Sequence, residues 1–405
     1  MSDRLVIIGG GQAAFACAAK LRALKDMRPI TIISREDAYP YQRPPLSKKY
    51  LLGEMSLDRL MFRPVEWFAE NAIEVLTGVS AISLDRAAKR VALSSGDSLD
   101  YDKLAFATGS TPRSLPDALT KGLSGVFTIR SFADADRLRP YMQAGRRLLV
   151  VGGGYIGLEA ASVARHLGLH VTVIEAAERI LARVASPATA DIFRAIHRDH
   201  GAELIEGAGL AALTGANGVV SGAELSDGRH LDVDMVIAGI GAYAEDELAR
   251  AAGIVCGNGI TVNEFGQTSD PDVYAMGDCA EQTWKGLQIR LESVQNAVDQ
   301  AENIALNLAA GREAYRPKPW FWSDQYDVKL QIAGFNLGYD ETISRPGARE
   351  GASSVWYFSR GELVAVDAIN DAKAYVVGKK LLDSGRGLGI RDAIANPETD
   401  LKSLT

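Results

Sequence analysis

The sequence predicts an α/β protein built on two parallel β-sheets, because one strand–turn–helix–strand pattern occurs in it twice. The clearer copy has an apolar run at Leu148–Val151, a G-x-G-x-x-G turn, helical spacing over Leu158–His166 and a second apolar run at His170–Ile174. It ends on Glu175, about 20 residues beyond the glycines, where an acid is expected. This order predicts a Rossmann-type nucleotide-binding unit; the alternative is a glycine-rich turn that only packs.

The residues of this turn have separate physical roles. Gly152 permits the turn, Gly154 lets a pyrophosphate approach the backbone, and Gly157 lets the helix pack close to the strand, while the helix N-terminus offers N–H groups to phosphates. Glu175 would accept hydrogen bonds from an adenosine ribose. It would repel a 2′-phosphate about 4 Å away by about 4 kcal/mol at an effective dielectric of about 20. Since no arginine immediately follows Glu175, the sequence predicts NADH rather than NADPH.

A second copy of the pattern lies at the N-terminus. Its strand, turn residues, helix and next strand are Leu5–Ile8, Gly9, Gly11, Ala14, Phe15–Leu24 and Ile30–Ile33. Arg35 and Glu36 stand where the ribose acid belongs. Two copies indicate two dinucleotides, of which one interpretation is FAD plus NADH. A duplicated fold with one inactive site is the alternative.

Composition excludes several classes of protein. The 405 residues are 47% hydrophobic and 23% charged, with a net charge of −7, which is typical of a globular protein of two or three domains. The sequence contains no run of basic residues of the kind that indicates nucleic-acid binding. Its apolar stretches are all shorter than the about 18 residues that a membrane span needs. No signal peptide is evident, so we expect a soluble, cytoplasmic protein.

Cysteine and histidine spacing predicts no metal site. Cys17, Cys256 and Cys279 are too far apart for a disulfide framework, a zinc pattern or a C-x-x-C redox pair. The histidines that fall on predicted helices are expected on solvated surfaces rather than in a metal group; they are His166, His197 and His200.

Two further segments carry candidate cofactor contacts. The prolines between Tyr39 and Lys48 predict an extended loop that could lay Arg43 and Lys48 along a polar cofactor; a plain surface loop is the alternative. Asp278 follows a predicted strand at Val273–Ala275, and a carboxylate at a strand's C-terminal end faces the ligand crevice of an open α/β sheet.

The last third of the chain contains a long helix and then a small sheet. Ser293 can cap a helix over Val294–Leu308, whose N-terminus would present its positive dipole to a ring that becomes anionic. The aromatic segment Pro319–Tyr326 could be core. After it we expect three strands and a helix, at Lys329–Ile332, Ser354–Phe358, Glu362–Val366 and Asp371–Leu382.

Taken together, these motifs resemble the FAD-dependent ferredoxin reductases of bacterial oxygenase systems. The specific segments are PYQRPPLSK (40–48), ATG (107–109), VVGGGYIGLEAA (150–161), the pair Gly277-Asp278, ESVQNA (292–297) and PWFWSDQYD (319–327). The resemblance covers nearly the whole chain. It implies a glutathione-reductase-like fold with an FAD domain (1–112 and 240–318), an NAD domain (113–239) and a small α+β C-terminal domain (319–405).

The resemblance also implies the contacts of each cofactor. For FAD they are Gly9, Gly11, Ala13, Ala14, Arg35, Glu36, Arg43, Lys48, Val79, Thr108, Arg130, Asp278, Val294, Gln295 and Trp322. For NADH they are Gly152, Gly154, Ile156, Glu175, Arg183 and Gly239. Lys48 and Glu159 are implied as the catalytic pair beside the flavin, with Trp320 and Trp322 near the ring edge. Two departures leave contacts open, since Arg35 holds a position often acidic in relatives and Ala244-Glu245 replaces a frequent Pro-Asn.

The implied activity is hydride transfer from NADH to FAD, followed by single-electron transfer to a [2Fe–2S] ferredoxin that serves a cytochrome P450 or a Rieske oxygenase. Ferredoxins of this kind are mostly acidic, so a basic docking patch is expected near the flavin, with Arg312, Arg316, Lys318 and Lys329 as candidates. The chain is expected to be monomeric. One alternative is an NADH-binding flavoprotein with slow turnover, of the apoptosis-inducing-factor type. A disulfide or peroxide reductase is disfavoured by the cysteine spacing.

Overall fold

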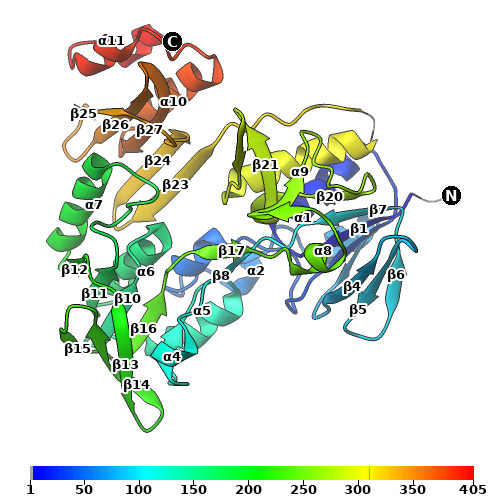
Figure 1. Ribbon diagram of the computed structural model, residues 1–405, viewed down its shortest axis with the longest axis horizontal. Helices are drawn as coiled ribbons and strands as arrows, with labels where there is room; N and C mark the ends of the chain where they lie inside the picture. The colour runs from blue at the N-terminus through cyan, green and yellow to red at the C-terminus, as the bar shows by residue number, and fades with distance from the viewer. Residues whose placement is uncertain (1–2, 310) are drawn as a thin grey trace. The chain divides into compact units, whose positions relative to one another are not determined.

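The computed structural model describes residues 3–309 and 311–405, which form two compact units (Figure 1). The first unit comprises Met1–Arg43, Ser56–Thr111 and Ala242–Pro317. The second comprises Pro44–Met55, Pro112–Gly241 and Lys318–Thr405. Each unit contains one of the two predicted parallel sheets. The division into FAD, NAD and C-terminal domains stays a prediction.

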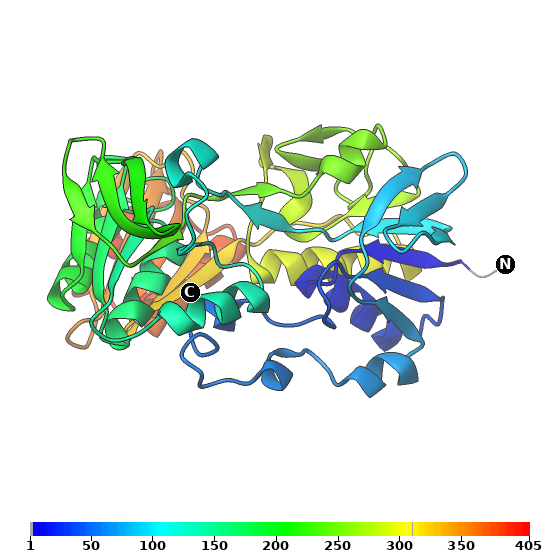
Figure 2. The same cartoon turned by 90° about the horizontal axis from the view of Figure 1, so that it is seen from below.

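A five-stranded parallel sheet, in the order β20-β7-β1-β2-β3, forms the centre of the first unit. Its strands are β1 (Leu5–Ile8), β2 (Ile30–Ile33), β3 (Ile73–Leu76), β7 (Lys103–Phe106) and β20 (Val273–Ala275). Every residue of β1 is buried, as expected of a strand covered on both faces. Helices α1 (Gln12–Ala23) and α9 (Val294–Ala309) lie side by side in this unit (Figure 2).

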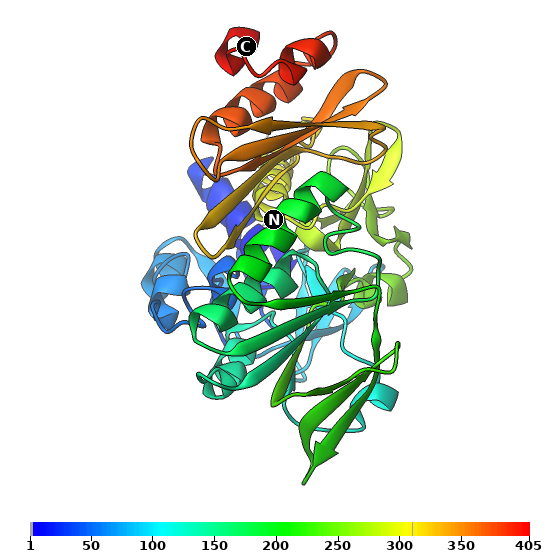
Figure 3. The ribbon, with the colours of Figure 1, turned by 90° about the vertical axis from the view of Figure 1, so that its left-hand side faces the viewer.

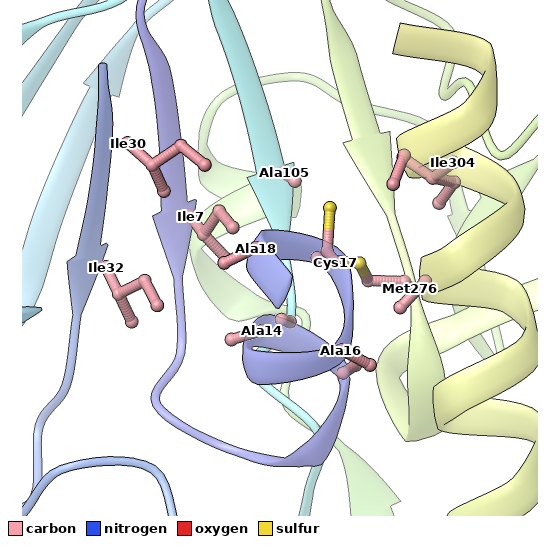
Figure 4. Packing of buried hydrophobic residues seen from close by; sticks show 14 of the residues in the cluster. Ile7, Ala14, Ala16, Cys17, Ala18, Ile30, Ile32, Ala105, Met276 and Ile304 are labelled. Carbon is pink, nitrogen blue, oxygen red and sulfur yellow. The ribbon is translucent and has the colours of Figure 1, made fainter. Parts of the chain in front are cut away.

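Small side chains on α1 allow this helix to approach the sheet closely. Ala14, Cys17 and Ala18 are fully buried and belong to one apolar cluster with Ile7 and Ile32 (Figure 4). Because alanine adds a single methyl group to the backbone, the helix axis lies near the strands and the turn that precedes it is held firmly. This packing fixes the position of the N-terminal glycine turn.

Smaller sheets and helices complete the first unit. Two smaller sheets contain β4 (Ala81–Asp85), β5 (Arg90–Leu93), β6 (Ser98–Asp100), β18 (Cys256–Gly257), β19 (Gly259–Val262), β21 (Ala280–Trp284) and β22 (Leu287–Ile289). Strands β19 and β21 pair in parallel, and the other neighbouring strands of these sheets pair antiparallel. The helices are α2 (Leu57–Leu60), α3 (Val65–Glu70), α8 (Glu247–Ala251) and the 3₁₀ turn η3 (Gly277–Cys279). A two-stranded ladder pairs β8 (Ser110–Pro112) with β17 (Ala242–Ala244).

The second unit repeats the parallel design in the order β12-β11-β10-β16-β9. The strands are β9 (Val126–Phe127), β10 (Arg147–Val151), β11 (His170–Glu175), β12 (Glu203–Glu206) and β16 (Met235–Ala238). Its helices and 3₁₀ turns are η1 (Pro44–Ser47), α4 (Asp117–Thr120), α5 (Phe132–Leu138), η2 (Arg139–Tyr141), α6 (Tyr155–His166) and α7 (Pro187–Asp199). An antiparallel sheet of β13 (Leu210–Ala216), β14 (Val219–Leu225) and β15 (His230–Asp232) adjoins them.

The C-terminal residues of the second unit form a five-stranded antiparallel sheet in the order β23-β24-β27-β26-β25. The strands are β23 (Trp320–Gln325), β24 (Val328–Gly334), β25 (Glu341–Pro346), β26 (Ser353–Ser359) and β27 (Glu362–Ile369). Helix α10 (Ala372–Asp383) packs on β24 and β27, and α11 (Arg391–Ala395) and η4 (Leu401–Leu404) follow it (Figure 3). On this sheet's edge, β23 packs against α6.

One local prediction differs from the structure. The loop between Tyr39 and Lys48 is not extended throughout, because Pro44–Ser47 forms a 3₁₀ helix and the Lys48 N–H donates to the Pro45 carbonyl at 3.0 Å. The φ angle that proline fixes is also that of a 3₁₀ helix, so the prolines alone did not distinguish the two. Within the described residues, every helix is too short or too polar to cross a bilayer.

Candidate functional site

The first glycine turn joins β1 to α1 and accepts no larger residue at its start. Gly9 has a φ of +119°, and a β-carbon there would stand 2.2 Å from the Ala107 carbonyl oxygen. At Gly11 that space is open, and no side chain in the described structure caps the N-terminus of α1. The first N–H groups of α1 therefore remain available to a ligand oxygen, which fits a dinucleotide pyrophosphate. Ala13 and Ala14, also predicted as contacts, are buried in the first turn of this helix.

The carboxyl ends of three parallel strands lie at the same edge of this sheet. The glycine turn follows β1, Thr108 follows β7, and Asp278 follows β20. From β1 the strand order runs outward in both directions, and such a switch point opens the ligand crevice of an α/β sheet. The Thr108 hydroxyl donates to the Glu245 carbonyl at 2.6 Å, and the Ser110 hydroxyl donates to Asp278 Oδ2 at 3.1 Å. Thr108 and Asp278 thus lie at the same edge of the sheet as the first glycine turn.

The acid of the first repeat is already paired with side chains. Arg43 Nη2 donates to Glu36 Oε1, and the Tyr41 hydroxyl donates to Glu36 Oε2. Burial alone would lower the pKa of the Arg43 guanidinium, but Tyr41, Glu36 and Asp278 raise it. Arg35 is 69% exposed, with its Nη1 3.7 Å from Glu245 Oε1. Glu36 is therefore the better-ordered of the two candidates for a ribose contact.

The N-terminus of α9 carries two further predicted contacts, Val294 and Gln295. The Ser293 hydroxyl accepts the Asn296 N–H at 3.1 Å, which confirms the predicted cap. This helix packs on η3, the turn that holds Asp278. Val79 is half-buried, and its N–H donates to the Ser34 carbonyl at 3.0 Å.

The second glycine turn, between β10 and α6, has the same backbone design with a tighter third position. Gly152 has a φ of +106°, and a β-carbon there would meet the Gly239 carbonyl oxygen at 2.5 Å. A β-carbon on Gly157 would lie only 2.2 Å from the Gly152 carbonyl oxygen, so this helix requires glycine where the first repeat has Ala14. Gly154 is open, and no side chain of the described residues caps α6. This turn also fits a pyrophosphate.

Glu175 lies at the second glycine turn, held by the backbone. Its Oε2 accepts the Gly153 N–H and its Oε1 accepts the Ala177 N–H, each at 2.8 Å. Both oxygens keep acceptor capacity for ribose hydroxyls, since a carboxylate oxygen has two lone-pair sites. The backbone thus orients the acid before any ligand arrives.

The remaining predicted NADH contacts lie around the same turn. Ile156 is 56% exposed in the first turn of α6, so its apolar side chain is accessible to a ligand. A β-carbon on Gly241, which follows β16, would begin 3.3 Å from Arg183 Nη2. Gly239 donates its N–H to the Val151 carbonyl at 2.8 Å, so Arg183 and Gly239 both lie near the carboxyl ends of β10 and β16.

Lys48 and Glu159 form a buried ion pair within the second unit. Lys48 Nζ is 3.0 Å from Glu159 Oε1, with side-chain exposures of 19% and 7%. Ser323 donates to Glu159 Oε1 at 2.8 Å, and Ser47 donates to Oε2 at 3.2 Å. Burial raises the pKa of the Glu159 carboxyl, and the Lys48 charge opposes this rise. The pair is present as predicted; its serine partners were not predicted.

Three predicted FAD contacts, Lys48, Arg130 and Trp322, belong to the second unit, whereas the other FAD residues belong to the first. Arg130 precedes α5, and its N–H donates to the Asp134 carboxylate at 3.1 Å. Trp320 and Trp322 are half-buried neighbours on β23, with ring centroids 5.5 Å apart. They lie on the strand face opposite Ser323, because side chains alternate along a strand.

One prediction on the histidines is wrong. His197 is fully buried, and its Nε2 lies 2.7 Å from Gln325 Oε1. Burial lowers its pKa to about 4. The covering strand, β23, lies 128 residues away in sequence, so the local polar pattern of α7 gave no sign of it. Among the described residues no group of three or more His, Cys, Asp or Glu could hold a metal ion.

Comparison with known proteins gives this geometry a family. Residues 3–301 match the family model described as pyridine nucleotide-disulphide oxidoreductase, and residues 320–405 match the reductase C-terminal model. The 5,5′-dehydrodivanillate O-demethylase ferredoxin reductase subunit of Sphingobium sp. (strain NBRC 103272 / SYK-6) is 41% identical, with 99% of this chain and 98% of that protein covered. Rhodocoxin reductase of Rhodococcus erythropolis is 38% identical, with coverages of 98% and 93%.

Solved structures agree with these relatives. The ferredoxin reductase for the CYP199A2 system from Rhodopseudomonas palustris superposes with a TM-score of 0.95 at 37% identity, covering 99% of both chains. Putidaredoxin reductase, solved as a covalent complex with putidaredoxin, gives 0.95 at 35% identity, covering 99% of this chain and 98% of that one. The predicted fold, enzyme class and use of FAD with a nicotinamide nucleotide are confirmed. The chain belongs to the pyridine nucleotide-disulphide oxidoreductase family and, within it, to the FAD-dependent ferredoxin reductases.

Proposed function

We propose that this protein takes electrons from NADH and delivers them to a [2Fe–2S] ferredoxin, which supplies a cytochrome P450 or a Rieske oxygenase. The observation that carries the proposal is that, among the described residues, the glycine turns before α1 and α6 carry no side-chain cap and suit a dinucleotide pyrophosphate. When bound, FAD accepts a hydride from NADH and releases electrons one at a time, as an iron–sulfur carrier requires. The names of the relatives, which are ferredoxin reductases of oxygenase systems, support this direction.

The thiols argue against a disulfide reductase. Cys17 and Cys279 are fully buried, and burial raises the pKa of both, to about 12 for Cys17. Cys256 is half-buried, and burial raises its pKa as well. The thiolate is the reactive form of cysteine, so none of these residues suits an exchange reaction.

Glu175 would determine the choice of nucleotide. Its carboxylate is fixed by the backbone, so it cannot readily turn away from a 2′-phosphate. Repulsion of about 4 kcal/mol corresponds to roughly a thousandfold in affinity, less where solvent screens it. The residues that follow, Ala176 and Ala177, offer no compensating positive charge. NADH is therefore the proposed donor.

Lys48 and Glu159 would serve the hydride step through charge and position. The positive charge of Lys48 would stabilise the negative charge that the flavin ring gains on reduction. Glu159 holds the Lys48 ammonium group in place, with Oε1 3.0 Å from Nζ. The N-terminus of α9, at Val294, would stabilise negative charge on the flavin through its helix dipole. Neither role needs a proton to move.

The ferredoxin-docking surface stays a prediction. Arg312, Arg316, Lys318 and Lys329 are all exposed, the first two in the first unit and the others in the second. Arg312 lies over the Phe265 ring at 4.6 Å. The monomeric state is likewise proposed.

Rapid anaerobic mixing of the FAD-loaded protein with NADH tests the catalytic role. Lys48→Met should slow flavin reduction by about a hundredfold, as expected when one electrostatic partner of the reacting centre is lost. Lys49→Met is the matched control, because Lys49 is the adjacent lysine and is exposed. Equal rates in Lys48→Met and the wild type would refute the proposed role.

Electron delivery is tested by cytochrome c reduction with NADH, with and without an added [2Fe–2S] ferredoxin. The proposal predicts strong dependence on the ferredoxin. Slow turnover at the same rate with and without the ferredoxin would favour an NADH-binding flavoprotein of another kind.

A further inference from the structure

A continuous series of buried polar side chains leads from Glu159 to the end of β23. Ser323 donates to Glu159 Oε1 at 2.8 Å, and Gln325 Nε2 donates to Ser323 Oγ at 3.1 Å. His197 Nε2 lies 2.7 Å from Gln325 Oε1, and the Tyr326 hydroxyl lies 3.1 Å from His197 Nδ1. All members of this series belong to the second unit, and all except Tyr326 are less than 9% exposed.

The strand and the helices bring these side chains together by their regular spacing. Ser323 and Gln325 point to the same face of β23 because side chains two apart share a face. That face packs on α6, which carries Glu159, and it meets His197 on α7. Tyr326 is fixed in the following turn, where its N–H donates to Ser162 Oγ of α6 at 2.8 Å.

Only one direction of hydrogen bonding satisfies the whole series while Glu159 is ionised. A carboxylate only accepts, so the Ser323 hydroxyl donates to it and must accept from the Gln325 amide group. Gln325 Oε1 must then accept, which requires the proton of His197 on Nε2. Nδ1 of the same ring is left as an acceptor, and the Tyr326 hydroxyl donates to it. The negative charge of Glu159 therefore sets the tautomer of a histidine three hydrogen bonds away.

The histidine is suited to this arrangement because it stays neutral. Burial lowers the pKa of His197 to about 4, with a smaller contribution from His200. Other ionisable groups that face the series are Lys48 at Glu159 and Arg165 beside Tyr326. A charged imidazole would be a donor at both nitrogens and could not accept from Tyr326.

We propose that Ser323, Gln325, His197 and Tyr326 are positioning residues that hold the Glu159 carboxylate in its ionised form and turned toward Lys48. The inference rests on the proposed role of the Lys48–Glu159 pair. Because the Ser323 hydroxyl always donates to Glu159 Oε1, it occupies one of the two lone-pair directions of that oxygen, and the Lys48 ammonium group can donate only along the other. The Lys48–Glu159 ion pair therefore keeps one geometry. If Glu159 loses its charge, the series is free to reverse, and Ser323 no longer has to donate to it.

The tautomer of His197 gives a test that does not depend on activity. Histidine labelled with ¹³C and ¹⁵N in the FAD-loaded protein distinguishes the two neutral tautomers by nuclear magnetic resonance, and His197→Asn identifies the signal. The wild type should show the Nε2–H form alone at neutral pH. In Glu159→Gln, where an amide can donate to Ser323, the Nδ1–H form should appear as well. An Nδ1–H tautomer in the wild type, or no change in Glu159→Gln, would overturn the proposal.

Kinetics supply a second, independent readout. Ser323→Ala should lower the rate constant of flavin reduction at saturating NADH by about tenfold with KM within about twofold, since a small displacement at a reacting centre costs that much. Ser323→Thr keeps the hydroxyl and should restore most of the rate, and Tyr326→Phe should show a smaller loss of the same kind. Ser354→Ala is the matched control, because Ser354 is an equally buried serine of the same sheet outside the series.

The outcomes separate the two proposals. If Lys48→Met leaves flavin reduction unchanged, the proposed role of the pair is wrong whatever His197 shows. If Lys48→Met slows the reaction but Ser323→Ala behaves like Ser354→Ala, the positioning series is wrong and the pair stands alone.

Discussion

The two nucleotide-binding repeats share a turn but hold their acids differently. In the first repeat Glu36 is paired with Arg43 and Tyr41, both side chains. In the second repeat Glu175 is held by two backbone N–H groups of its own turn. Side chains can exchange partners when a ligand arrives, whereas the backbone presents a preformed acceptor. The second design suits a nucleotide that enters and leaves in each turnover, because less reorganisation opposes its binding.

The two repeats also differ at the third position of the glycine turn, where the second repeat leaves less space for a side chain. Ala14 is accommodated in α1, but Gly157 lies so close to the Gly152 carbonyl that a methyl group would overlap it. Gly157→Ala should therefore force α6 away from β10 and abolish saturable reduction by NADH, while the protein keeps its FAD. Ala14→Gly should retain both nucleotides and lose only about 1 kcal/mol of helix stability. NADH titrations and FAD content check both variants; a normal KM for Gly157→Ala would break the comparison.

Reversing the charge at the fixed acid should have the next largest effect. Glu175→Arg removes the repulsion of a 2′-phosphate, so the ratio of kcat/KM for NADPH over NADH should rise by roughly a thousandfold at most. Glu178→Arg provides the control, because Glu178 is an exposed carboxylate of the same loop. Equal ratios in the two variants would mean that Glu175 does not contact the ribose.

The second repeat also packs on the C-terminal sheet, where Thr189 of α7 donates to the buried carboxylate of Asp367. Asp367 of β27 accepts from Tyr357 and from Thr189 of α7, and its Oδ1 has no partner among the described residues. Burial raises its pKa from 3.8 to about 6. The folded state thus binds the Asp367 proton more tightly than the unfolded chain does. The contribution of this proton to the free energy of unfolding is fully present below about pH 4 and is lost as pH rises through about 6.

Asp367→Asn should remove that dependence. The wild type should lose roughly 3 kcal/mol relative to the variant between about pH 4 and about pH 7. Urea unfolding of both proteins across this range measures the difference, and the titration of His197 cancels because both proteins retain it. Parallel stability curves would show that Asp367 is not desolvated.

The smallest effect is expected at the first repeat's acid. Glu36→Gln keeps the shape of the side chain but weakens its partly exposed ion pair with Arg43. The side chains of Glu36 and Arg43 are 27% and 24% exposed, respectively. Affinity for FAD should fall by about 1 kcal/mol, or roughly fivefold, in equilibrium titrations of the apoprotein. A loss as large as that in Glu175→Arg would show that the two acids are equally fixed.

The sequence predicted the repeats better than the contacts between distant segments. Strand and helix spacing located both glycine turns, although α1 begins at Gln12 and α6 at Tyr155, earlier than predicted, because the turn glycines lead straight into each helix. The burial of His197 was missed, since its partner Gln325 lies 128 residues away. A signal did exist, in the alternation of Ser323 and Gln325 with larger side chains along β23.

Electron transfer from NADH to FAD on this polypeptide is tested most directly by anaerobic addition of NADH to the FAD-loaded protein, followed by its visible absorption. We expect rapid bleaching of the yellow colour at stoichiometric NADH, and recovery when an oxidised [2Fe–2S] ferredoxin is added. Protein that takes up no FAD, or whose yellow spectrum persists unchanged under NADH, would contradict it.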